Sequence, residues 1–257
     1  MITRRKMLVL LPAAAVAWKF VLAGTPAEAP GYHPSTPTAG ALGTPGYDRS
    51  QHWWGMLLDI DKCIGCGSCV RACSNENNVP EGYFRTWVER YHVSGWEQEV
   101  PQVDSPNGAL NGFPPSKFEG GKNFFVPKMC NHCKDSPCTQ VCPVGATLHT
   151  PDGVVLVDEK YCLGCRYCIQ ACPYGCRFLH PTKRTAEKCS LCYHRITKGL
   201  TTACCENCPT GARQLVDLKD PNDPIHEYLK THSVQVLKPH LATGAKVFYH
   251  DLDGSVR

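Results

Sequence analysis

The hydrophobic residues of this chain lie in short runs, and these runs predict short strands and helices. Residues 84–93 (FRTWVERYHV) have the composition of a strand, and residues 154–157 (VVLV) predict another strand directly after a turn at Pro151–Gly153. Toward the C-terminus, Ile225–Thr231 predicts a short helix and Ala245–Tyr249 a further strand. With 22 glycines and 21 prolines, the chain is too interrupted for a helical bundle.

An apolar run at the N-terminus, Met7–Trp18, follows the basic cluster Arg4, Arg5 and Lys6. This layout predicts an export signal, and the adjacent arginines resemble a twin-arginine signal, whose cargo crosses the membrane already folded. The alternative is a chance basic start before a short N-terminal anchor, although the run is short for a membrane span. We therefore expect residues 1–29 to be a twin-arginine signal or an anchor, and the protein to lie on the periplasmic side of the cytoplasmic membrane.

Composition and charge narrow the function classes. Hydrophobic residues make up 42% of the 257 residues, but this share includes 18 cysteines, so the ordinary apolar core is thin. The formal net charge of +4 falls to +1 without residues 1–29, because that segment holds four basic and one acidic side chains. A balance so close to neutral does not indicate a nucleic-acid-binding protein. Residues 30–50 are rich in Pro, Gly, Ser and Thr and predict an extended linker.

Sixteen of the 18 cysteines fall into four groups of four, numbered here in chain order. The groups are Cys63, Cys66, Cys69 and Cys73; Cys130, Cys133, Cys138 and Cys142; Cys162, Cys165, Cys168 and Cys172; and Cys189, Cys192, Cys204 and Cys208. Groups one and three share the spacing C-x2-C-x2-C-x3-C, and a proline follows the last cysteine of groups two, three and four. Cys176 and Cys205 remain outside the groups.

Three kinds of cysteine chemistry compete for this pattern. An exported protein can carry disulfides, but three thiols in one tight loop converge on one site and cannot all pair with each other. Zinc uses C-x2-C pairs, yet it does not explain a triple followed by a fourth cysteine and a proline. That run is typical of bacterial ferredoxins, in which three cysteines hold one cubane cluster and the fourth binds the neighbouring cluster.

The spacing also has a mechanical reason. Glycines such as Gly65, Gly67 and Gly164 let the loop curl around a cluster and point its N–H groups at the sulfurs. We expect the fourth cysteine on the helix that follows each loop, and the proline after it to end that helix. Because the fourth ligand belongs to the neighbouring cluster, the groups must work in pairs. Spacing alone leaves the pairs open, but groups two and three are adjacent in sequence, which leaves one and four as the other pair.

The four groups, together with SNENNVPEG, CPYGCRFLHP, the segment from CSLC to CPTGAR and VLKPHLATGAKVFY, resemble a known family. It comprises the four-cluster iron–sulfur subunits of polysulfide, tetrathionate and dimethyl-sulfoxide reductases, with relatives in formate-dependent nitrite reduction and some periplasmic hydrogenases. The resemblance covers about residues 54–250. It is highly specific for the family and does not single out one member.

The resemblance implies four [4Fe–4S] clusters, because all sixteen ligand positions are cysteine. The implied ligand sets are Cys63, Cys66, Cys69 and Cys208 (set 1); Cys189, Cys192, Cys204 and Cys73 (set 2); Cys130, Cys133, Cys138 and Cys172 (set 3); and Cys162, Cys165, Cys168 and Cys142 (set 4). Cys204 is preferred over Cys205 because only Cys204 leaves a three-residue gap before Cys208. We expect Cys176 to be a small buried apolar residue.

The expected fold is α+β and loop-rich, with two pseudo-symmetric units like bacterial ferredoxins, an inserted segment and a C-terminal extension. The expected divisions are linker 30–53, first unit 54–75 plus 186–215, insert 76–127, second unit 128–185 and extension 216–257. The insert carries four aromatic residues that predict either a docking surface or core: Trp87, Trp96, Phe124 and Phe125. We expect the extension to wrap the body or to contact a membrane partner.

Other side chains near the cysteines give weaker signals. Six basic residues offer compensation for anionic clusters, with ordinary surface charge as the alternative for each: Lys62, Arg71, Lys134, Arg166, Arg177 and Arg195. His132 and His194 stand without catalytic partners and predict structural roles. The sequence contains no C-x-x-C-H haem motif, P-loop, dinucleotide-binding loop or H-E-x-x-H motif, and no catalytic residue is nominated.

Electron transfer is therefore the expected function. In the family that the chain resembles, such subunits pass electrons between a quinone-reactive integral membrane subunit and a redox partner. Here that partner would be a molybdopterin enzyme, a multihaem cytochrome or a hydrogenase. Two alternatives differ in class: a self-contained iron–sulfur reductase of a small sulfur or nitrogen compound, and a metal-stapled interaction module without redox function.

Overall fold

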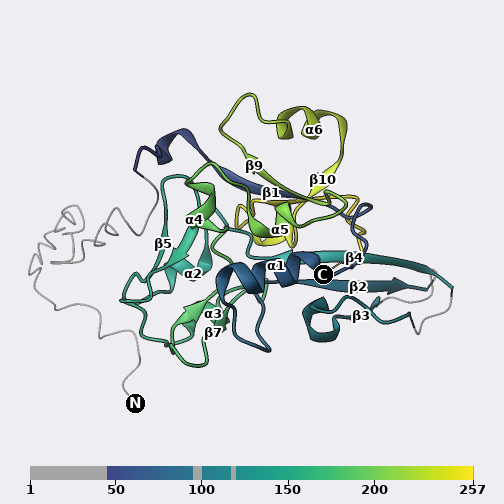
Figure 1. Cartoon of the computed structure of the whole chain (residues 1–257), viewed down its shortest axis with the longest axis horizontal. Helices are drawn as coiled ribbons and strands as arrows, with labels where there is room; N and C mark the ends of the chain where they lie inside the picture. Colours follow the sequence, from purple (N-terminus) through teal and green to yellow (C-terminus); the bar gives the residue numbers. More distant parts are fainter. Residues whose placement is uncertain (1–44, 95–99, 117–119, 257) are drawn as a thin grey trace, which may run out of the picture. The chain divides into compact units, whose positions relative to one another are not determined.

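The protein is represented by a computed structural model, which describes residues 45–94, 100–116 and 120–256 (Figure 1). The predicted export signal, most of the predicted linker and Trp96 lie outside these residues. The described chain has an α+β, loop-rich fold with four small sheets and short helices, as the sequence predicted. None of the described helices combines the length and apolar character needed to cross a lipid bilayer.

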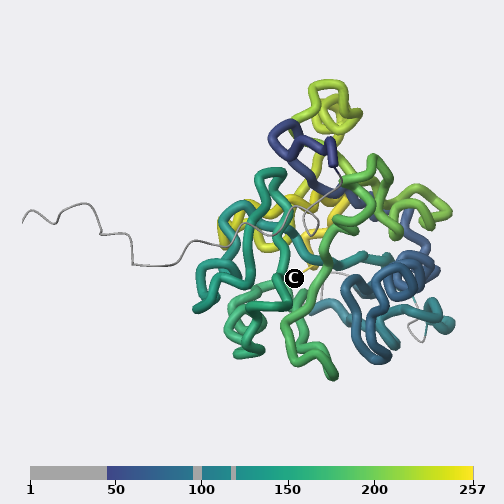
Figure 2. The backbone as a smooth tube through the Cα atoms, turned by 60° about the vertical axis from the view of Figure 1, so that its left-hand side comes forward, coloured from purple at the N-terminus to yellow at the C-terminus, as the bar shows by residue number. Residues whose placement is uncertain are grey.

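The central strand of the largest sheet is β1 (Trp54–Asp59), which is buried at five of its six residues. It pairs antiparallel with β9 (Arg213–Asp217) and parallel with β11 (Val247–His250), and β10 (Val234–Gln235) pairs with β11 at the edge. The sheet thus joins the start of the first unit, the chain after group four and the C-terminal extension. Figure 2 shows the dark early segment and the yellow C-terminal segment next to one another.

The insert forms a second sheet in the order β3–β2–β4 (Figure 1). Its strands are β2 (Thr86–Val93), β3 (Gln102–Asp104) and β4 (Lys122–Met129), so the strand predicted at 84–93 begins at Thr86. Phe124 is buried and its ring stacks on Tyr91 at 5.4 Å between centroids, while Trp87 and Phe125 pack partly buried against the same core. These three predicted aromatic residues therefore contribute to the core.

Two hairpins lie in or directly beside the second unit, since β8 begins at residue 186. The first joins β5 (Thr147–His149) to β6 (Val155–Val157) through the predicted turn, where Gly153 has a φ of +80°. The second joins β7 (Phe178–Leu179) to β8 (Ala186–Glu187). Each hairpin follows a cysteine group, because β5 comes after group two and β7 after group three.

The helices are short, and most of them lie within or beside the cysteine groups. They are α1 (Ser68–Asn77), α2 (Pro137–Gln140), α3 (Tyr167–Gln170), α4 (Tyr193–Ile196), α5 (Ala203–Glu206) and α6 (Ile225–Thr231), with 3-10 turns η2 (Arg49–Gln51), η3 (Pro106–Ala109) and η4 (Pro239–Leu241). The bounds of α6 agree with the helix predicted in the extension.

The predicted place of the fourth cysteine was wrong for three groups. Among the fourth cysteines of the four groups, only Cys73 lies on a helix, because α1 continues to Asn77. In groups two, three and four, the short helix carries the third cysteine and ends two residues before the fourth. The proline that follows Cys142, Cys172 or Cys208 disfavours the helical conformation for the cysteine itself, and group one has no such proline.

The end of the predicted linker is docked on the body rather than extended. The indole N–H of Trp54 donates to the hydroxyl of Tyr47 at 2.6 Å, and that hydroxyl donates to Asp152 at 2.8 Å. Asp152 is fully buried and also accepts from the hydroxyl of Tyr193 at 3.0 Å. A buried carboxylate needs such donors, and Tyr47 supplies one of them.

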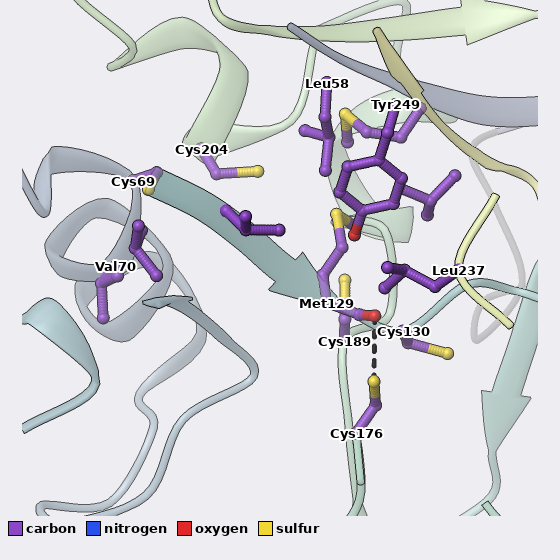
Figure 3. Packing of buried hydrophobic residues seen from close by; sticks show 14 of the residues in the cluster. Leu58, Cys69, Val70, Met129, Cys130, Cys176, Cys189, Cys204, Leu237 and Tyr249 are labelled. Carbon is purple, nitrogen blue, oxygen red and sulfur yellow. Dashed lines mark hydrogen bonds between the residues drawn. The ribbon is translucent and has the colours of Figure 1, made fainter. Parts of the chain in front are cut away.

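The main core lies between the two larger sheets and the cysteine groups. Met56, Leu58, Met129 and Tyr249 are among its largest fully buried side chains. Figure 3 shows cysteines of three groups among these residues, so the thiols and the apolar core share one region. The extension also crosses to group two, where the N–H of Lys134 donates to the carbonyl of Gly244 at 2.9 Å.

Candidate metal centres

All four cysteine groups share one backbone device. The residue two positions after the first cysteine has a left-handed conformation in each group: Gly65, His132, Gly164 and Leu191, with φ of 68°, 43°, 66° and 54°. This turn directs backbone N–H groups toward sulfur: the N–H of His132 donates to Cys130 at 3.4 Å, and that of Leu191 to Cys189 at 3.3 Å. Groups two and four therefore build the same cradle as the regularly spaced groups.

The glycines of group one also permit close approach to another segment. A Cβ atom on Gly67 would lie 1.9 Å from the carbonyl oxygen of Ala109, and φ at Gly67 is +72°. No other residue fits this position without moving η3. The predicted glycines thus serve the curvature of the loop and its packing against the insert.

Two cavities are lined by complete thiol sets. The first is lined by all four cysteines of set 1, together with the buried side chain of Arg213. The second is lined by all four cysteines of set 2. Residues from groups one and four line both cavities, which is possible because β1 pairs with β9 and brings those groups together.

The thiols of groups two and three form a second neighbourhood. Cys130, Cys138 and Cys172 surround the thiol of Cys133, and their negative charge raises its pKa in addition to burial. Within set 4, Cys162 is a charged neighbour of Cys168, and the guanidinium of Arg177 and the set 3 thiol of Cys138 are two more. Of the remaining two members, Cys142 is half-buried and Cys165 is exposed.

Burial makes these thiols poor acids on their own. Desolvation, with a smaller contribution from neighbouring thiols, raises the pKa of Cys63 to about 11 and that of Cys189 to about 12. Four thiolates around one cavity repel each other unless a cationic group lies between them, and iron in a cubane cluster is such a group. Among the described residues, no three His, Cys, Asp or Glu side chains gather around a single-ion site.

The two ungrouped cysteines lie close to grouped ones. Cys205 is not among the residues that line the set 2 cavity; its sulfur lies 3.4 Å from Sδ of Met56. Cys176 is buried as predicted, but it is not merely apolar, because its thiol donates to the carbonyl of Met129 at 2.9 Å (Figure 3). Contact with the side chain of Cys176, together with the backbone N–H groups of Cys176 and Tyr174, lowers the pKa of Cys172 to about 5.

The six basic residues that the sequence suggested as compensation for anionic clusters lie in different environments. Arg177 is buried, and its guanidinium donates to Cys138 at 3.0 Å. Arg195 bonds to Glu76 and Glu206, and Lys62 to Asp59. The other three are exposed at the surface: Arg71, Lys134 and Arg166. Surface charge is therefore the better interpretation for all except Arg177.

Arg213 was missed by the sequence analysis, although it is buried beside sets 1 and 2. The negative charges of Cys69 and Cys204 raise the pKa of its guanidinium against the opposing effect of burial. A signal was present in the sequence: CPYGCR and CPTGAR place Arg177 and Arg213 at the same distance from the last cysteine of their groups.

The two histidines near the cysteines have structural partners, as predicted. His132 is buried, and its Nδ1 accepts from the backbone N–H of Val155 at 3.1 Å. His194 lies at the surface, 2.6 Å from a carboxylate oxygen of Glu76.

Comparison with known proteins independently supports iron–sulfur clusters as the cofactors. Two family models described as "4Fe-4S dicluster domain" match residues 62–146 and 122–218. A subunit of the tetrathionate reductase of Salmonella typhimurium is 43% identical over 206 residues, 79% of this chain and 74% of the relative. The corresponding subunit from Archaeoglobus fulgidus is 45% identical over 198 residues, covering 77% and 82%.

A third relative belongs to a reductase that is named for a different substrate. An iron–sulfur subunit assigned to a dimethyl sulfoxide reductase of Halobacterium salinarum is 35% identical over 215 residues, 76% of this chain and 78% of the relative. The two dicluster models and 18 cysteines account for four [4Fe–4S] clusters. Each family model matches one continuous stretch of sequence. Each of the two thiol cavities, in contrast, combines cysteines of groups one and four, which are far apart in the sequence.

Proposed function

Because the chain belongs to the family of 4Fe–4S iron–sulfur subunits of tetrathionate and dimethyl-sulfoxide reductases, we propose that it relays electrons between two partners of such a complex. One partner is a quinone-reactive integral membrane subunit. The other is a redox partner on the periplasmic side: a molybdopterin enzyme, a multihaem cytochrome or a hydrogenase, and the names of the relatives favour a reductase. The twin-arginine pattern at Arg4 and Arg5 supports the periplasmic location.

The proposed ligands are the four sets derived from the resemblance. They are Cys63, Cys66, Cys69 and Cys208; Cys189, Cys192, Cys204 and Cys73; Cys130, Cys133, Cys138 and Cys172; and Cys162, Cys165, Cys168 and Cys142. The two shared cavities support sets 1 and 2, and the charged neighbours of Cys133 support set 3. When bound, the clusters supply one-electron redox chemistry, and the chain supplies their position, burial and hydrogen bonds.

The observation that carries the relay is the continuity of the four sets. Cys204 of set 2 is a charged neighbour of Cys69 in set 1. Cys130 of set 3 is a charged neighbour of Cys189 in set 2, and both lie around Met129 in Figure 3. The thiols of Cys138 and Cys168 join sets 3 and 4 in the same way. An unbroken series suits a protein that conducts electrons between two ends.

Both ends of this series reach the surface. At set 4, Cys165 is exposed, and Tyr161, Leu163 and Tyr167 around it are 50%, 69% and 59% exposed. At set 1, Ile64 is 58% exposed beside the half-buried Cys66. Exposed apolar side chains at both ends suit contact with partner proteins, since such residues are otherwise costly to leave in water.

Metal and sulfide analysis of anaerobically purified protein tests the cofactor assignment. We expect about 16 iron and 16 sulfide per chain, because each of four cubanes contains four of each. Zinc without acid-labile sulfide would contradict the proposal. A gentle membrane extraction, followed by capture of this chain, tests the partners: an integral membrane subunit and a reductase should be recovered together.

Activity of the purified chain alone separates the relay from its main alternative. The relay predicts that dithionite-reduced protein passes electrons to its partner and shows no steady turnover with tetrathionate, dimethyl sulfoxide or nitrite. Steady turnover of the isolated chain with one of these compounds would favour a self-contained reductase.

A further inference from the structure

Two buried arginines occupy equivalent places in the internal repeat of this chain. Arg177 lies five residues after Cys172 in CPYGCR, and Arg213 lies five residues after Cys208 in CPTGAR. Each is the first residue, or nearly so, of the strand that follows its group, because β9 begins at Arg213 and β7 directly after Arg177. Their side chains are almost completely buried, with 5% and 3% of their surface exposed.

The contacts of the two guanidinium groups correspond. Arg177 donates through Nη2 to Cys138 at 3.0 Å and through Nη1 to the hydroxyl of Thr147 at 3.3 Å. Arg213 donates through Nη2 to the hydroxyl of Thr86 at 3.0 Å, and its Nη1 lies 3.9 Å from Sδ of Met129. Each arginine is therefore held by a threonine that follows the partner group in sequence: Thr147 follows group two, and Thr86 follows group one at the start of β2 in the insert.

Part of the thiol neighbourhood of each arginine also corresponds, in addition to Cys130 near Arg177 and to Cys205 and Cys63 near Arg213. The third cysteines of groups two and three, Cys138 and Cys168, are charged neighbours of Arg177. The third cysteines of groups one and four, Cys69 and Cys204, are charged neighbours of Arg213. Each guanidinium thus lies between thiols assigned to two different clusters of one unit.

No carboxylate neutralises these charges within the described ranges. Neither Arg177 nor Arg213 forms an ion pair with Asp or Glu among the described residues, in contrast to Arg195, which pairs with Glu76 and Glu206. An arginine does not lose its proton in a protein, and a buried charge without a counter-charge is strongly unfavourable. The thiolates are the anions that balance these two cations.

The repeat gives the unit of groups two and three one arginine at this position rather than two. Group two ends in CPVGAT, so Thr147 stands where groups three and four have arginine. A second guanidinium at that position would lie beside Arg177, whose Nη1 is within hydrogen-bonding distance of Thr147. In this unit, group three therefore supplies the guanidinium and group two supplies the neutral hydroxyl that accepts its hydrogen bond.

We propose that Arg177 and Arg213 are positioning residues that each place one fixed positive charge between the two clusters of a unit and raise the reduction potential of both. The inference rests on the proposed ligand sets. Reduction transfers one electron from the preceding centre to the cluster, with no bond made or broken and no proton required. The guanidinium stabilises the added negative charge at low dielectric, where a charge acts more strongly than in water.

Potentiometric titration of holoprotein followed by electron paramagnetic resonance tests this proposal. The variants are Arg177→Gln and Arg213→Gln, with Arg177→Lys and Arg213→Lys retaining the charge. The exposed Arg184, in the loop between β7 and β8, gives the matched control Arg184→Gln. Iron and sulfide content is measured in every sample, so the loading of the clusters is known separately from their potentials.

Each glutamine substitution should change the potentials of the two clusters in its own unit. Arg177→Gln lowers the two potentials of sets 3 and 4, and Arg213→Gln lowers those of sets 1 and 2. The ratio of oxidised to reduced cluster at a fixed potential should rise at least about tenfold, which is 59 mV for a one-electron couple. The lysine variants should shift less than the glutamine variants, and Arg184→Gln should leave all four potentials unchanged.

Fully loaded glutamine variants with wild-type potentials would overturn the proposal. If a glutamine variant does not load, wild-type protein with 15N-labelled arginine decides instead: hyperfine coupling between guanidinium nitrogen and the reduced clusters supports the proposal, and its absence overturns it. Failure of the ligand sets is distinguishable, because it would appear in the iron and sulfide content of wild-type protein and not as a change of potential.

Discussion

The sulfur of Cys205 lies 3.4 Å from Sδ of Met56, whereas the neighbouring Cys204 lines the cavity of set 2. Of these two adjacent cysteines, Cys205 therefore contacts the core and Cys204 is a proposed ligand. The hydroxyl of Thr202 lies 3.4 Å from the sulfur of Cys204, which adds a polar contact on the ligand side.

Single serine substitutions at these two positions should differ in their effect on the clusters. Cys204→Ser should remove or convert one of the four clusters, because it deletes a thiolate ligand, whereas Cys205→Ser should retain all four. Iron and sulfide analysis gives the content, and electron paramagnetic resonance of reduced protein gives the number of centres. Loss of a cluster only in the Cys205 variant would show that the ligand had been misassigned.

The close approach between Gly67 and Ala109 predicts a steric effect that can be separated from backbone strain. Gly67→Ala places a Cβ atom 1.9 Å from the carbonyl of Ala109, while Gly82, with a similar φ of +78°, has no atom within 4 Å of the added Cβ. Gly82→Ala should cost only the left-handed conformation, roughly 1–2 kcal/mol. Gly67→Ala should cost distinctly more and reduce the iron content of set 1.

Thermal unfolding of anaerobic holoprotein and iron analysis measure both effects. Because the two glycines share a left-handed backbone, the difference between their alanine variants reports the contact with η3. Equal melting temperatures and equal iron content in the two variants would show that η3 moves aside without penalty.

The exposed residues at the two ends of the thiol series predict partner-specific defects. Leu163→Glu should slow electron transfer to one partner, and Ile64→Glu should slow transfer to the other, each by roughly tenfold or about 1.4 kcal/mol. A charge placed in an apolar contact must be desolvated on docking, which weakens the complex. Stopped-flow measurements with each partner in turn give the two rates.

Leu200 supplies the control for these variants. It is 50% exposed and lies between α4 and α5. In the sequence it is far from both Cys66 and Cys165. Leu200→Glu should leave both rates unchanged, and all three variants should retain full iron content. If Leu163→Glu and Ile64→Glu transferred electrons to both partners at the wild-type rate, these surfaces would not be docking sites.

The paired arginines at the N-terminus predict a defect in export. Replacing Arg4 and Arg5 together by lysine keeps the charge but removes the twin-arginine pattern, so folded holoprotein should remain in the cytoplasm. Cell fractionation with detection of this chain measures the distribution. Lys6→Gln is the control and should be exported, while wild-type export of the double variant would show that another route carries the protein.

Several features of the fold and the sites follow from local chain geometry, and the sequence predicted these. The spacing within each cysteine group identifies cluster loops, because a loop of that length holds its thiols near one another wherever it is placed. The helix at Ile225–Thr231 and the strand in residues 84–93 were visible for the same reason, since their patterns are local. The central strand Trp54–Asp59 was not predicted, because its importance lies in its partners β9 and β11.

Other features depend on which distant segments pack together. Arg177 and Arg195 looked alike as basic residues near cysteines, yet one is buried against Cys138 and the other pairs with Glu76 at the surface. The repeat of CPYGCR in CPTGAR marked Arg213 in the sequence, but its burial and its contact with Thr86 of the insert appear only in the tertiary structure.

The cysteine content and the spacing of its groups by themselves determined the cofactor, because metal ligation selects residue types and short separations in the chain. The tertiary structure alone decided which charges are desolvated beside the thiols: it buries Arg177 and Arg213 there and leaves Arg195 paired with Glu76. These outcomes arise from strand pairing over more than a hundred residues, as between β1 and β9, and no local pattern encodes the low-dielectric environment that such pairing creates.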